Sequence, residues 1–240
     1  MSSKNFELWP LKWDTDYFGV SSAKVSLSGV IDEQGQDEVI EFCKGFEFVT
    51  ITNIDNIKEN NYWIGNRTNA FLADMNIQFL KVLANKPDYQ DEKTYVVNSL
   101  PRNEQIVDIA RKSFNHSRFF NDPKLPSVQA SNIYLHWIEC AFGQESKYFA
   151  ISERDGNVAG FTLFSFNEDS CVIELIAVDE KYHGQKVGKS LIHTIETFVI
   201  DQGIQKIRVG TQVNNISAAQ FYYAMGFKYV SCGSIYHLWR

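Results

Sequence analysis

Apolar and polar residues alternate in two rhythms along the second half of the chain, one typical of helices and the other of strands. In residues 103–114, Ile106, Ile109 and Ala110 recur at helical spacing, so one side of this segment is apolar. An Asp-Gly pair at positions 155 and 156 indicates a tight hairpin between two strands. The pattern predicts, in order, two helices, three strands, a helix, a strand, a helix and two short final strands, over residues 103–114, 130–143, 146–153, 158–167, 170–178, 187–203, 204–213, 217–225 and 227–240.

The first half of the chain has fewer clear elements. A strand, a helix and two further strands are predicted over residues 21–28, 32–46, 46–54 and 69–83. A polar stretch that contains Pro87 follows them and marks a boundary. We therefore divide the chain into an N-terminal α/β subdomain, residues 1–90, and a larger domain of the α/β (α+β) class, residues 91–240. The first part is short, so we expect it to share its core with the second.

Composition narrows the class of protein. The 240 residues are 44% hydrophobic, enough for a core, and the net charge of −6 argues against a nucleic-acid partner. No segment approaches the ~20 apolar residues of a membrane helix, and the first residues lack the apolar run of a signal peptide. The four scattered cysteines are typical of reduced thiols, and the five histidines show no metal-ligand spacing. We expect a cytoplasmic protein with no metal, no nucleic-acid partner and no membrane partner; the sequence allows a homodimer.

Residues 178–191 join a predicted strand to a predicted helix, a position where phosphate groups are often bound. The start of a helix offers free backbone N–H groups, and Gly184 and Gly188 would let a phosphate approach the backbone. Lys181, Lys186 and Lys189 add positive charge. Without further evidence, the segment fits either a phosphate-binding loop or an ordinary turn with three solvated lysines.

Two patterns in the second half resemble those of the GNAT superfamily of acetyl-CoA-dependent N-acetyltransferases. The family pattern V-x-x-x-x-[QR]-x-x-G-x-[GA], counted from Val178, falls on His183, Lys186 and Gly188, of which only Gly188 agrees. The family pattern N-x-x-A-x-x-x-Y-x-x-x-G-F is matched throughout, by Asn215, Ala218, Tyr222, Gly226 and Phe227. The resemblance covers residues 104–240 and implies the GNAT acyltransferase fold, a mixed central sheet flanked by helices.

The resemblance also implies where acetyl-CoA, the co-substrate, is held. Ile176 and Val178 are expected to pair with the amides of pantetheine, and Asn215 is expected to contact the pantetheine arm. A structural alternative is that Asn215 only caps the helix that follows it. The pyrophosphate is expected on the loop after Val178. The acetyl-CoA residues implied in this way are Ile176, Ala177, Val178, His183, Gly184, Gln185, Lys186, Val187, Gly188, Lys189, Asn215, Ala218 and Tyr222.

Tyr222 and Glu174 are the catalytic candidates. In the family, the tyrosine of the second pattern donates a proton to the departing thiolate, and the alternative for Tyr222 is a core aromatic. Glu174 is the one charged side chain on its predicted strand, and a carboxylate there is costly unless it is paired or used. It is therefore either the base for the substrate ammonium or a salt-bridged residue, and solvent could take the proton instead.

A closer resemblance, to the TDP-fucosamine N-acetyltransferases, extends into the first half. It rests on the pattern W-[DE]-x-x-[FY]-F-G at residues 13–19, on residues 116–126 and 134–143, and on the ending at 235–240. These enzymes acetylate the 4-amino group of a nucleotide-linked 4-amino-6-deoxy sugar, so the resemblance implies an amino-sugar nucleotide as the second substrate. An arginine suits the diphosphate, and aromatic rings suit the base or the sugar, although each ring could instead belong to the core. The acceptor candidates are Tyr17, Phe18, Arg118, Phe119, Tyr134 and Trp137.

Two other functions fit the same residues. A GNAT enzyme could acetylate a protein N-terminus, a polyamine or an amino acid, and the acidic net charge would suit a cationic substrate. A non-catalytic acyl-CoA sensor is the third hypothesis, prompted by the departures from the family pattern at His183 and Lys186. Tyr222 and Asn215 argue against a sensor, because a sensor needs no proton donor.

Overall fold

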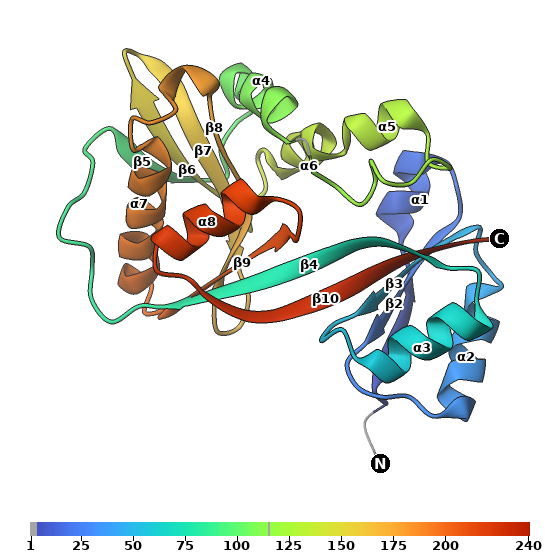
Figure 1. The fold of residues 1–240 in the computed structure, drawn as a ribbon. Coiled ribbons are helices and arrows are strands. Elements are labelled where there is room, and N and C mark those ends of the chain that lie inside the picture. The colour runs from blue at the N-terminus through green and yellow to red at the C-terminus, as the bar shows by residue number, and fades with distance from the viewer. Residues whose placement is uncertain (1–3, 115) are drawn as a thin grey trace.

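The computed structural model describes residues 4–114 and 116–240, and their strands form one ten-stranded mixed sheet (Figure 1). The strand order is β1-β2-β3-β10-β4-β9-β8-β7-β6-β5. The strands are β1 (Phe6–Pro10), β2 (Ser22–Leu27), β3 (Phe48–Asn53), β4 (Phe71–Val82), β5 (Thr94–Asn98), β6 (Tyr148–Arg154), β7 (Asn157–Phe166), β8 (Cys171–Val178), β9 (Lys206–Gln212) and β10 (Lys228–Trp239). The helices are α1 (Lys12–Phe18), α2 (Glu33–Cys43), α3 (Lys58–Arg67), α4 (Glu104–Ser113), α5 (Ser127–Ser131), α6 (Ile133–Ala141), α7 (Val187–Asp201) and α8 (Ile216–Ala224).

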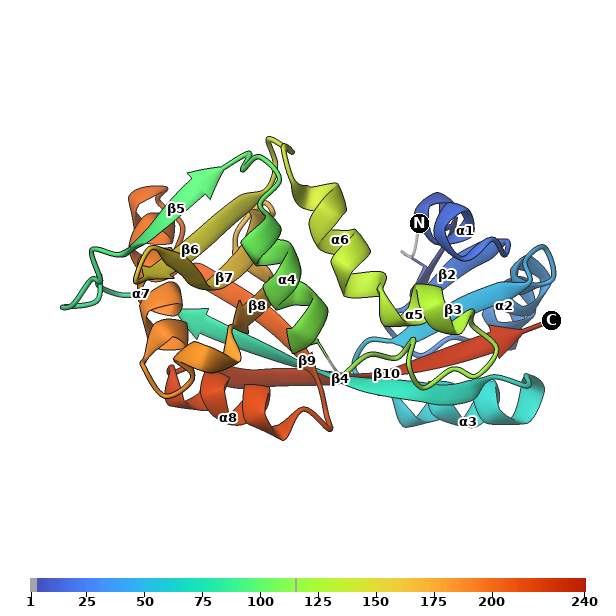
Figure 2. The ribbon, with the colours of Figure 1, turned by 90° about the horizontal axis from the view of Figure 1, so that it is seen from above.

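From α4 to α8, the second half follows the predicted order of elements, with the short helix α5 as an addition. Its β6–β7 hairpin turns at Asp155 and Gly156, whose φ angles of 52° and 76° are those that a tight Asp-Gly turn requires. Helices α4 and α6 pack on one face of strands β6 to β8, and α7 packs on the other (Figure 2). Within the described residues, no helix is both long enough and apolar enough to cross a membrane.

The end of the chain forms one long strand, so the prediction of two short strands was wrong. Strand β10 pairs with β3 through residues 234–239 and with β4 through residues 228–237. Gly233 lies within this strand because a Cβ there would come within 2.8 Å of the carbonyl oxygen of Ile54. On its other side, β4 pairs with β9. In Figure 1, β4 and β10 run side by side from one half of the molecule to the other, and they join both halves into one sheet.

Five elements were not predicted from the sequence: β1, β5 and the helices α1, α3 and α5. Helix α3 illustrates the reason, because it contains three asparagines, which are poor helix formers. Its Trp63 and Ile64 are buried in the core of the first half, and the side-chain amide of Asn60 donates to the carbonyl oxygen of Gly29 at 2.9 Å. Tertiary contacts therefore stabilise a helix that its own sequence does not favour.

Strands β8 and β9 separate part of the way along their length. Their parallel pairing covers three residue pairs and ends at Ile173 opposite Val209. On the other side of β8, Leu163 pairs with Leu175 and Phe164 pairs with Ile173, which leaves Glu174 as the extra residue of a β-bulge. A bulge bends its strand, so β8 turns away from β9 after this point. The gap that opens between the two strands is the starting point of the candidate site.

Candidate active site

One large cavity, of about 1080 Å³, follows the gap between β8 and β9. Its walls come from the end of β8, the start of α7, helix α8, strand β4, helix α6 and residues 112–114 and 116–119. The sequence-predicted residues that line it are Glu174, Ile176, Ala177, Val178, His183, Gly184, Lys186, Val187, Gly188, Lys189, Asn215, Ala218, Tyr222, Arg118, Phe119, Tyr134 and Trp137. Three other predicted residues, Gln185, Tyr17 and Phe18, lie outside this wall.

The backbone at the end of β8 is directed into the gap. The N–H of Asp179 donates to the carbonyl oxygen of Ala159 on β7 at 2.9 Å. Backbone groups of successive strand residues point to opposite sides, so the N–H and C=O groups of Ile176 and Val178 face away from β7. An extended amide-bearing chain that enters the gap would therefore meet the N–H and C=O of Ile176 and the N–H of Val178 as strand partners, whereas the C=O of Val178 already contacts Nε2 of His183.

The start of α7 presents unpaired backbone donors to the same cavity. The first hydrogen bond of the helix runs from the N–H of Ser190 to the carbonyl oxygen of Lys186 at 3.0 Å. The N–H groups of Val187, Gly188 and Lys189 have no acceptor among the described residues, and no side chain caps this end. Three free donors and the positive end of the helix dipole form a site for an anion.

Lys186 occupies a backbone conformation that glycine adopts more easily. Its φ of 63° and the φ of 77° at Gly184 are both in the left-handed region. For a residue with a Cβ this conformation costs roughly 1–2 kcal/mol. Lys186 therefore holds a backbone conformation that the glycine of the family pattern would adopt with less strain.

Gly188 is required by a neighbouring side chain. A Cβ at this position would lie 3.2 Å from two ring atoms of Phe221 on α8 and 3.9 Å from a methyl group of Val178. The sequence predicts that Gly188 lets a phosphate approach the backbone, and this stays a prediction. In the structure a side chain at this position would point at the Phe221 ring, so the glycine also allows α7 and α8 to approach each other.

His183 and Gln185 both fold back onto the loop. The Nε2 atom of His183 lies 3.1 Å from the carbonyl oxygen of Val178, which can only accept, so Nε2 carries the hydrogen. The side-chain amide of Gln185 donates to the carbonyl oxygen of Lys181 at 3.3 Å. The Gln185 side chain is outside the cavity wall, and the expected contact of this loop residue with the co-substrate stays a prediction.

Asn215 caps helix α8. Its Oδ1 accepts hydrogen bonds from the N–H of Ala218 at 3.2 Å and from the hydroxyl of Ser217 at 3.0 Å. This is the structural alternative that the sequence left open. The side-chain NH₂ group of Asn215 makes no hydrogen bond to the residues described here, and the residue lines the cavity, so a donor remains for a ligand.

Tyr222 combines a packed ring with an unbonded hydroxyl. The ring is buried among Phe79, Phe221 and Phe227, with centroid distances of 5.7, 5.6 and 5.7 Å. The hydroxyl forms no hydrogen bond with any described residue, and Tyr222 lines the cavity. Burial raises the pKa of this hydroxyl well above its ordinary value. At neutral pH the group therefore holds its proton and is available as a donor.

Glu174 is held by three donors. Its Oε1 accepts from the ammonium of Lys147 and the hydroxyl of Ser165, both at 2.5 Å, and its Oε2 accepts from the indole N–H of Trp137 at 3.1 Å. Of the two roles left open by the sequence, the salt-bridged residue is the one that these contacts describe. A carboxylate that is engaged in this way is a poor base, because its lone pairs already hold donors.

Arg118 lines the cavity, and its guanidinium has no hydrogen-bonded or ion-paired partner among the described residues. Its guanidinium carbon is 4.1 Å from the centroid of the Phe119 ring, and its Nε is buried without a hydrogen bond. In the described part of the chain, no carboxylate lies within salt-bridge distance of this cation. A guanidinium has five N–H donors and no acceptor, so Arg118 is free to bind an anion.

The segment that carries Arg118 is anchored at its far end. The carboxylate of Asp122 accepts hydrogen bonds from Nδ1 of His237 at 2.6 Å and from the indole of Trp239 at 2.9 Å, both on β10. The side-chain amide of Asn121 donates to the carbonyl oxygen of Ala73 on β4 at 3.0 Å. These contacts tie the segment to both long strands of the sheet.

Tyr134 and Trp137 form the α6 wall of the cavity. Their rings are stacked, with centroids 6.4 Å apart. The hydroxyl of Tyr134 donates to the carbonyl oxygen of His116 at 2.8 Å and accepts from the side-chain amide of Gln212 at 3.3 Å. The two rings therefore offer a flat apolar surface beside the Glu174 carboxylate.

Tyr17 and Phe18 were expected in the acceptor pocket, and the structure places both elsewhere. Phe18 is buried against Phe119, with ring centroids 5.3 Å apart. Tyr17 stacks on His136 at 4.3 Å, and its hydroxyl donates to the carbonyl oxygen of Gln129 at 2.8 Å. Their role is to fasten α1 to helices α5 and α6, because aromatic surface at this junction must be buried.

Sequence reasoning missed the contribution of β4. Asp74, Asn76 and Gln78 alternate along this strand, so all three project from one face, and all three line the cavity. The amide of Gln78 lies against Gly210 on β9, where a Cβ would come within 2.5 Å of its nitrogen. The available signal was the alternation of three polar residues in an otherwise apolar strand.

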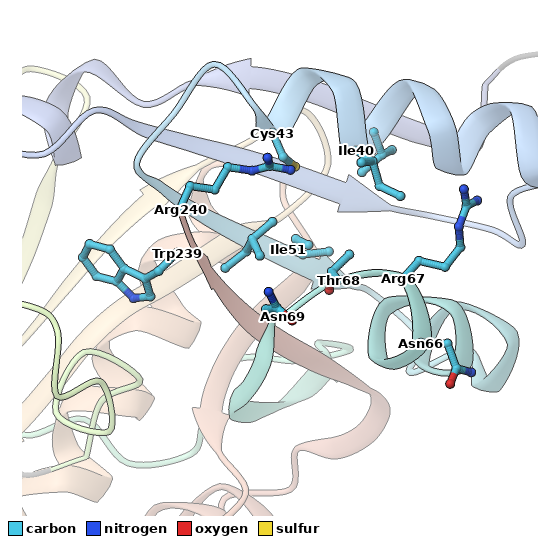
Figure 3. Close-up of a pocket in the computed structure, with 11 residues that line it drawn as sticks. Ile40, Cys43, Ile51, Asn66, Arg67, Thr68, Asn69, Trp239 and Arg240 are labelled. Carbon is cyan, nitrogen blue, oxygen red and sulfur yellow. The ribbon is translucent and has the colours of Figure 1, made fainter.

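A second cavity, of about 460 Å³, lies in the first half, between α2, the end of α3 and the end of β10 (Figure 3). Arg67 pairs with Asp37 at 2.6 Å, and Arg240 extends toward Cys43. Burial raises the pKa of the Cys43 thiol to about 11, so this thiol is not a reactive thiolate at neutral pH. None of the predicted site residues lies in this cavity.

Solved structures are similar to the chain over nearly its whole length. A conserved protein of unknown function from Staphylococcus epidermidis has a TM-score of 0.66 at 10% identity, covering 100% of this chain and 93% of that chain. A GCN5-related N-acetyltransferase from Sphaerobacter thermophilus has a TM-score of 0.62 at 9% identity, covering 97% and 76%. At these identities the likeness concerns the fold alone.

Curated relatives are similar to part of the chain. The spore coat polysaccharide biosynthesis protein SpsD of Bacillus subtilis is 28% identical over 136 residues, which are 57% of this chain and 47% of SpsD. An uncharacterized N-acetyltransferase of Methanocaldococcus jannaschii is 31% identical over 81 residues, which are 33% of this chain and 52% of that protein. The similarity thus spans about half the length of these relatives. The Acetyltransferase (GNAT) family model matches residues 104–227, more than half of this chain. The chain therefore belongs to the GNAT family of acetyltransferases.

Proposed function

We propose that this protein transfers the acetyl group of acetyl-CoA to the amine of a nucleotide-linked 4-amino-6-deoxy sugar similar to TDP-fucosamine. The observation that carries the proposal is a pair of anion positions on different walls of one cavity. The start of α7 has free N–H groups, and Arg118 has a guanidinium without an acidic partner in the described residues. The first suits the pyrophosphate of CoA, and the second suits the diphosphate of a sugar nucleotide.

Acetyl-CoA fits the first wall of the cavity. The pantetheine arm would run along the end of β8, with its amides on the backbone of Ile176 and Val178 and a carbonyl on the side-chain NH₂ group of Asn215. The pyrophosphate would accept hydrogen bonds from residues 187–189. This arrangement directs the thioester to the gap where β8 leaves β9, close to Tyr222.

Acetyl transfer needs a neutral amine and a stable leaving group. The amine nitrogen attacks the thioester carbonyl carbon, and the carbon–sulfur bond then breaks as the tetrahedral intermediate collapses. The Tyr222 hydroxyl gives its proton to the departing thiolate and recovers one from the amide nitrogen that has formed. The raised pKa of Tyr222 supports the donor role, because the hydroxyl enters the reaction protonated.

The first 90 residues contribute to the acceptor side in this proposal. Their strand β4 contributes Asp74, Asn76 and Gln78 to the cavity, and amide and carboxylate groups suit the hydroxyls and amine of a sugar. Residues 91–240 supply the acetyl-CoA side and also the acceptor candidates Arg118 and Tyr134. Both halves therefore contribute to the acceptor side, and the sheet that carries them is continuous.

The similarity to SpsD supports a sugar acceptor, because that protein's name places it in polysaccharide biosynthesis. A polyamine or peptide acceptor would leave Arg118 without a function, since neither needs a second anion position. A non-catalytic sensor would leave the unbonded hydroxyl of Tyr222 without one.

Thiol release from acetyl-CoA tests the proposal. The acceptors are TDP-4-amino-4,6-dideoxygalactose, the free amino sugar, spermidine and a peptide with a free N-terminus. We expect the nucleotide sugar to be acetylated well and the free sugar poorly. Equal activity on the free sugar, or faster acetylation of spermidine or the peptide, would contradict the proposal.

Variants of Arg118 test its role in the same assay. Arg118→Ala should raise the KM for the nucleotide sugar about 10- to 100-fold, the cost of one charged hydrogen-bonded contact, and leave the KM for acetyl-CoA unchanged. Arg118→Lys keeps the charge but loses the bidentate hydrogen bonding, so its KM for the nucleotide sugar should lie between those of the wild type and Arg118→Ala. An unchanged KM for the nucleotide sugar in Arg118→Ala would remove the diphosphate contact from the proposal.

A further inference from the structure

Asp74 is a buried carboxylate with an unused oxygen. It is 9% exposed, and its Oδ1 accepts only the N–H of the adjacent Met75, at 2.7 Å. Its Oδ2 has no hydrogen bond, and no cation lies within salt-bridge distance, among the residues for which coordinates are described. Removing a carboxylate from water is costly unless it is paired, so an unpaired one on a cavity wall indicates a ligand.

The other carboxylates on the cavity wall are unsuitable as bases for the acceptor. Glu174 is engaged by an ammonium, a hydroxyl and an indole N–H. Glu180 belongs to the 3-10 turn Glu180–Tyr182, beside the start of α7 and therefore on the acetyl-CoA side. Asp74 is the carboxylate on the acceptor side.

The register of the sheet places Asp74 just beyond the gap between β8 and β9, where we propose that the acetyl group is transferred. Strands β8 and β9 separate after Ile173 and Val209, and Asn76 on β4 pairs with Gln212, three residues further along β9. Asp74 follows Asn76 on the same face, about 7 Å further along the strand at ~3.3 Å per residue. An acceptor whose nitrogen reaches the thioester from this side must therefore pass over Asp74.

We propose that Asp74 binds the ammonium of the acceptor and takes the proton that frees the amine for attack. The proposal rests on the proposed acetyl transfer, but not on which amine is the acceptor. The ammonium donates to Oδ2 of Asp74, and its proton moves to the carboxylate. The neutral nitrogen then forms the bond to the thioester carbon, the thiolate leaves with the Tyr222 proton, and Asp74 releases its proton to solvent.

The groups around Asp74 agree with this role. Asp74 interacts electrostatically with Arg118 and His116 of the segment after α4, with Tyr134 of α6 and with Cys232 of β10. Burial raises the pKa of the Asp74 carboxyl, and the positive Arg118 and a hydrogen bond from Met75 limit the rise. A carboxylate that is more basic than usual is better able to accept a proton from an ammonium.

The pH dependence of kcat/KM tests the proposal in wild type, Asp74→Asn, Asp74→Glu and Asp14→Asn. The acceptor is whichever of TDP-4-amino-4,6-dideoxygalactose, spermidine and the N-terminal peptide the wild type acetylates fastest. Asp74→Asn should lower kcat/KM about 100-fold near pH 7. Its rate should then keep rising with pH toward the pKa of the acceptor amine, and Asp74→Glu should recover part of the loss. A wild-type rate and profile in Asp74→Asn would overturn the proposal.

Asp14→Asn is the matched control. Asp14 is 8% exposed and is also close to Arg118, but it does not line the cavity. Its replacement should leave the shape of the pH profile unchanged. An equal change in both variants would mean that the charge around Arg118, and not proton transfer at Asp74, controls the rate, and the proposal would fail.

A measurement without substrates separates this proposal from the identity of the acceptor. If the Asp74 carboxylate serves to bind the acceptor and has no partner in the folded protein, replacing it by asparagine removes a buried unpaired charge and breaks no ion pair. The unfolding temperature of Asp74→Asn at pH 7.5 should therefore equal or exceed that of the wild type. The difference in unfolding temperature between the variant and the wild type should become smaller as the pH falls toward 3.8, the ordinary pKa of aspartate, because the wild-type carboxyl becomes protonated. A fall of more than about 2 °C would show a structural partner and overturn the proposal. A wild type that prefers spermidine or the peptide would overturn the proposed acceptor and leave this result standing.

Discussion

Replacing Tyr222 by phenylalanine separates its two possible roles. The ring contacts with Phe79, Phe221 and Phe227 remain in the variant. The hydroxyl has no hydrogen-bond partner among the described residues, so its removal breaks no internal bond. A typical hydrogen bond contributes about 1 kcal/mol, and we expect the free energy of unfolding to change by less than ~0.5 kcal/mol.

The effect on catalysis should be much larger. Loss of a positioned proton donor lowers turnover by roughly 10- to 1000-fold, which corresponds to about 1.4 to 4 kcal/mol of transition-state stabilisation. The Kd for acetyl-CoA should stay within about twofold, because the hydroxyl contacts the thiolate only as it leaves. The assays are thiol release at saturating substrates, acetyl-CoA titration and urea unfolding.

Tyr148→Phe is the control for this experiment. Tyr148 packs against the same core cluster, 5.5 Å from Phe164, but it is not on the cavity wall. We expect it to match the wild type in both rate and stability. If Tyr222→Phe keeps wild-type turnover, or if its loss of rate equals that of Tyr148→Phe, then Tyr222 is a core aromatic and the donor role is wrong.

Three further predictions follow from the same geometry. Lys186→Gly should raise the free energy of unfolding by about 0.5–1 kcal/mol in urea, because it relieves the left-handed φ of 63°; a loss of stability would contradict the strain argument. Gly188→Ala should lower the free energy of unfolding by about 1 kcal/mol and weaken acetyl-CoA binding in a titration, because the new Cβ meets the Phe221 ring at 3.2 Å. Unchanged values of both quantities would show that α7 and α8 can shift apart. Burial lowers the pKa of His237 below its ordinary value of 6.5, so the folded state binds fewer protons than the unfolded state and stability should fall as the pH drops below about 6.5. Urea unfolding at pH 7.5 and 5.5 should show this loss in the wild type and less of it in His237→Gln; equal losses would assign the effect to other groups.

Features that depend on neighbouring residues in the chain could be predicted from the sequence. The Asp-Gly hairpin at 155 and 156, the helical spacing in α4 and the strand–loop–helix at residues 178–191 all follow from local backbone preferences. Helix α8 also follows from local sequence, whereas the proton-donor role of Tyr222 comes from the resemblance to the family pattern and stays a prediction. The positions of α1, α3 and β1 could not be predicted, because long-range packing rather than propensity stabilises them.

Only the tertiary structure decided which side chains meet in the cavity. The sequence allowed Glu174 to be either a base or a salt-bridged residue. The structure shows that Lys147, Ser165 and Trp137, from three other segments, all donate to its carboxylate. Asp74 carried little signal in the sequence, and its significance comes from the pairing of β4 with β9 and β10, more than 100 residues away. Burial and the absence of a partner are properties of the assembled sheet. For this protein, local sequence determined the loop and helix that we propose for acetyl-CoA, and strand pairing across the two halves determined the wall that we propose for the acceptor.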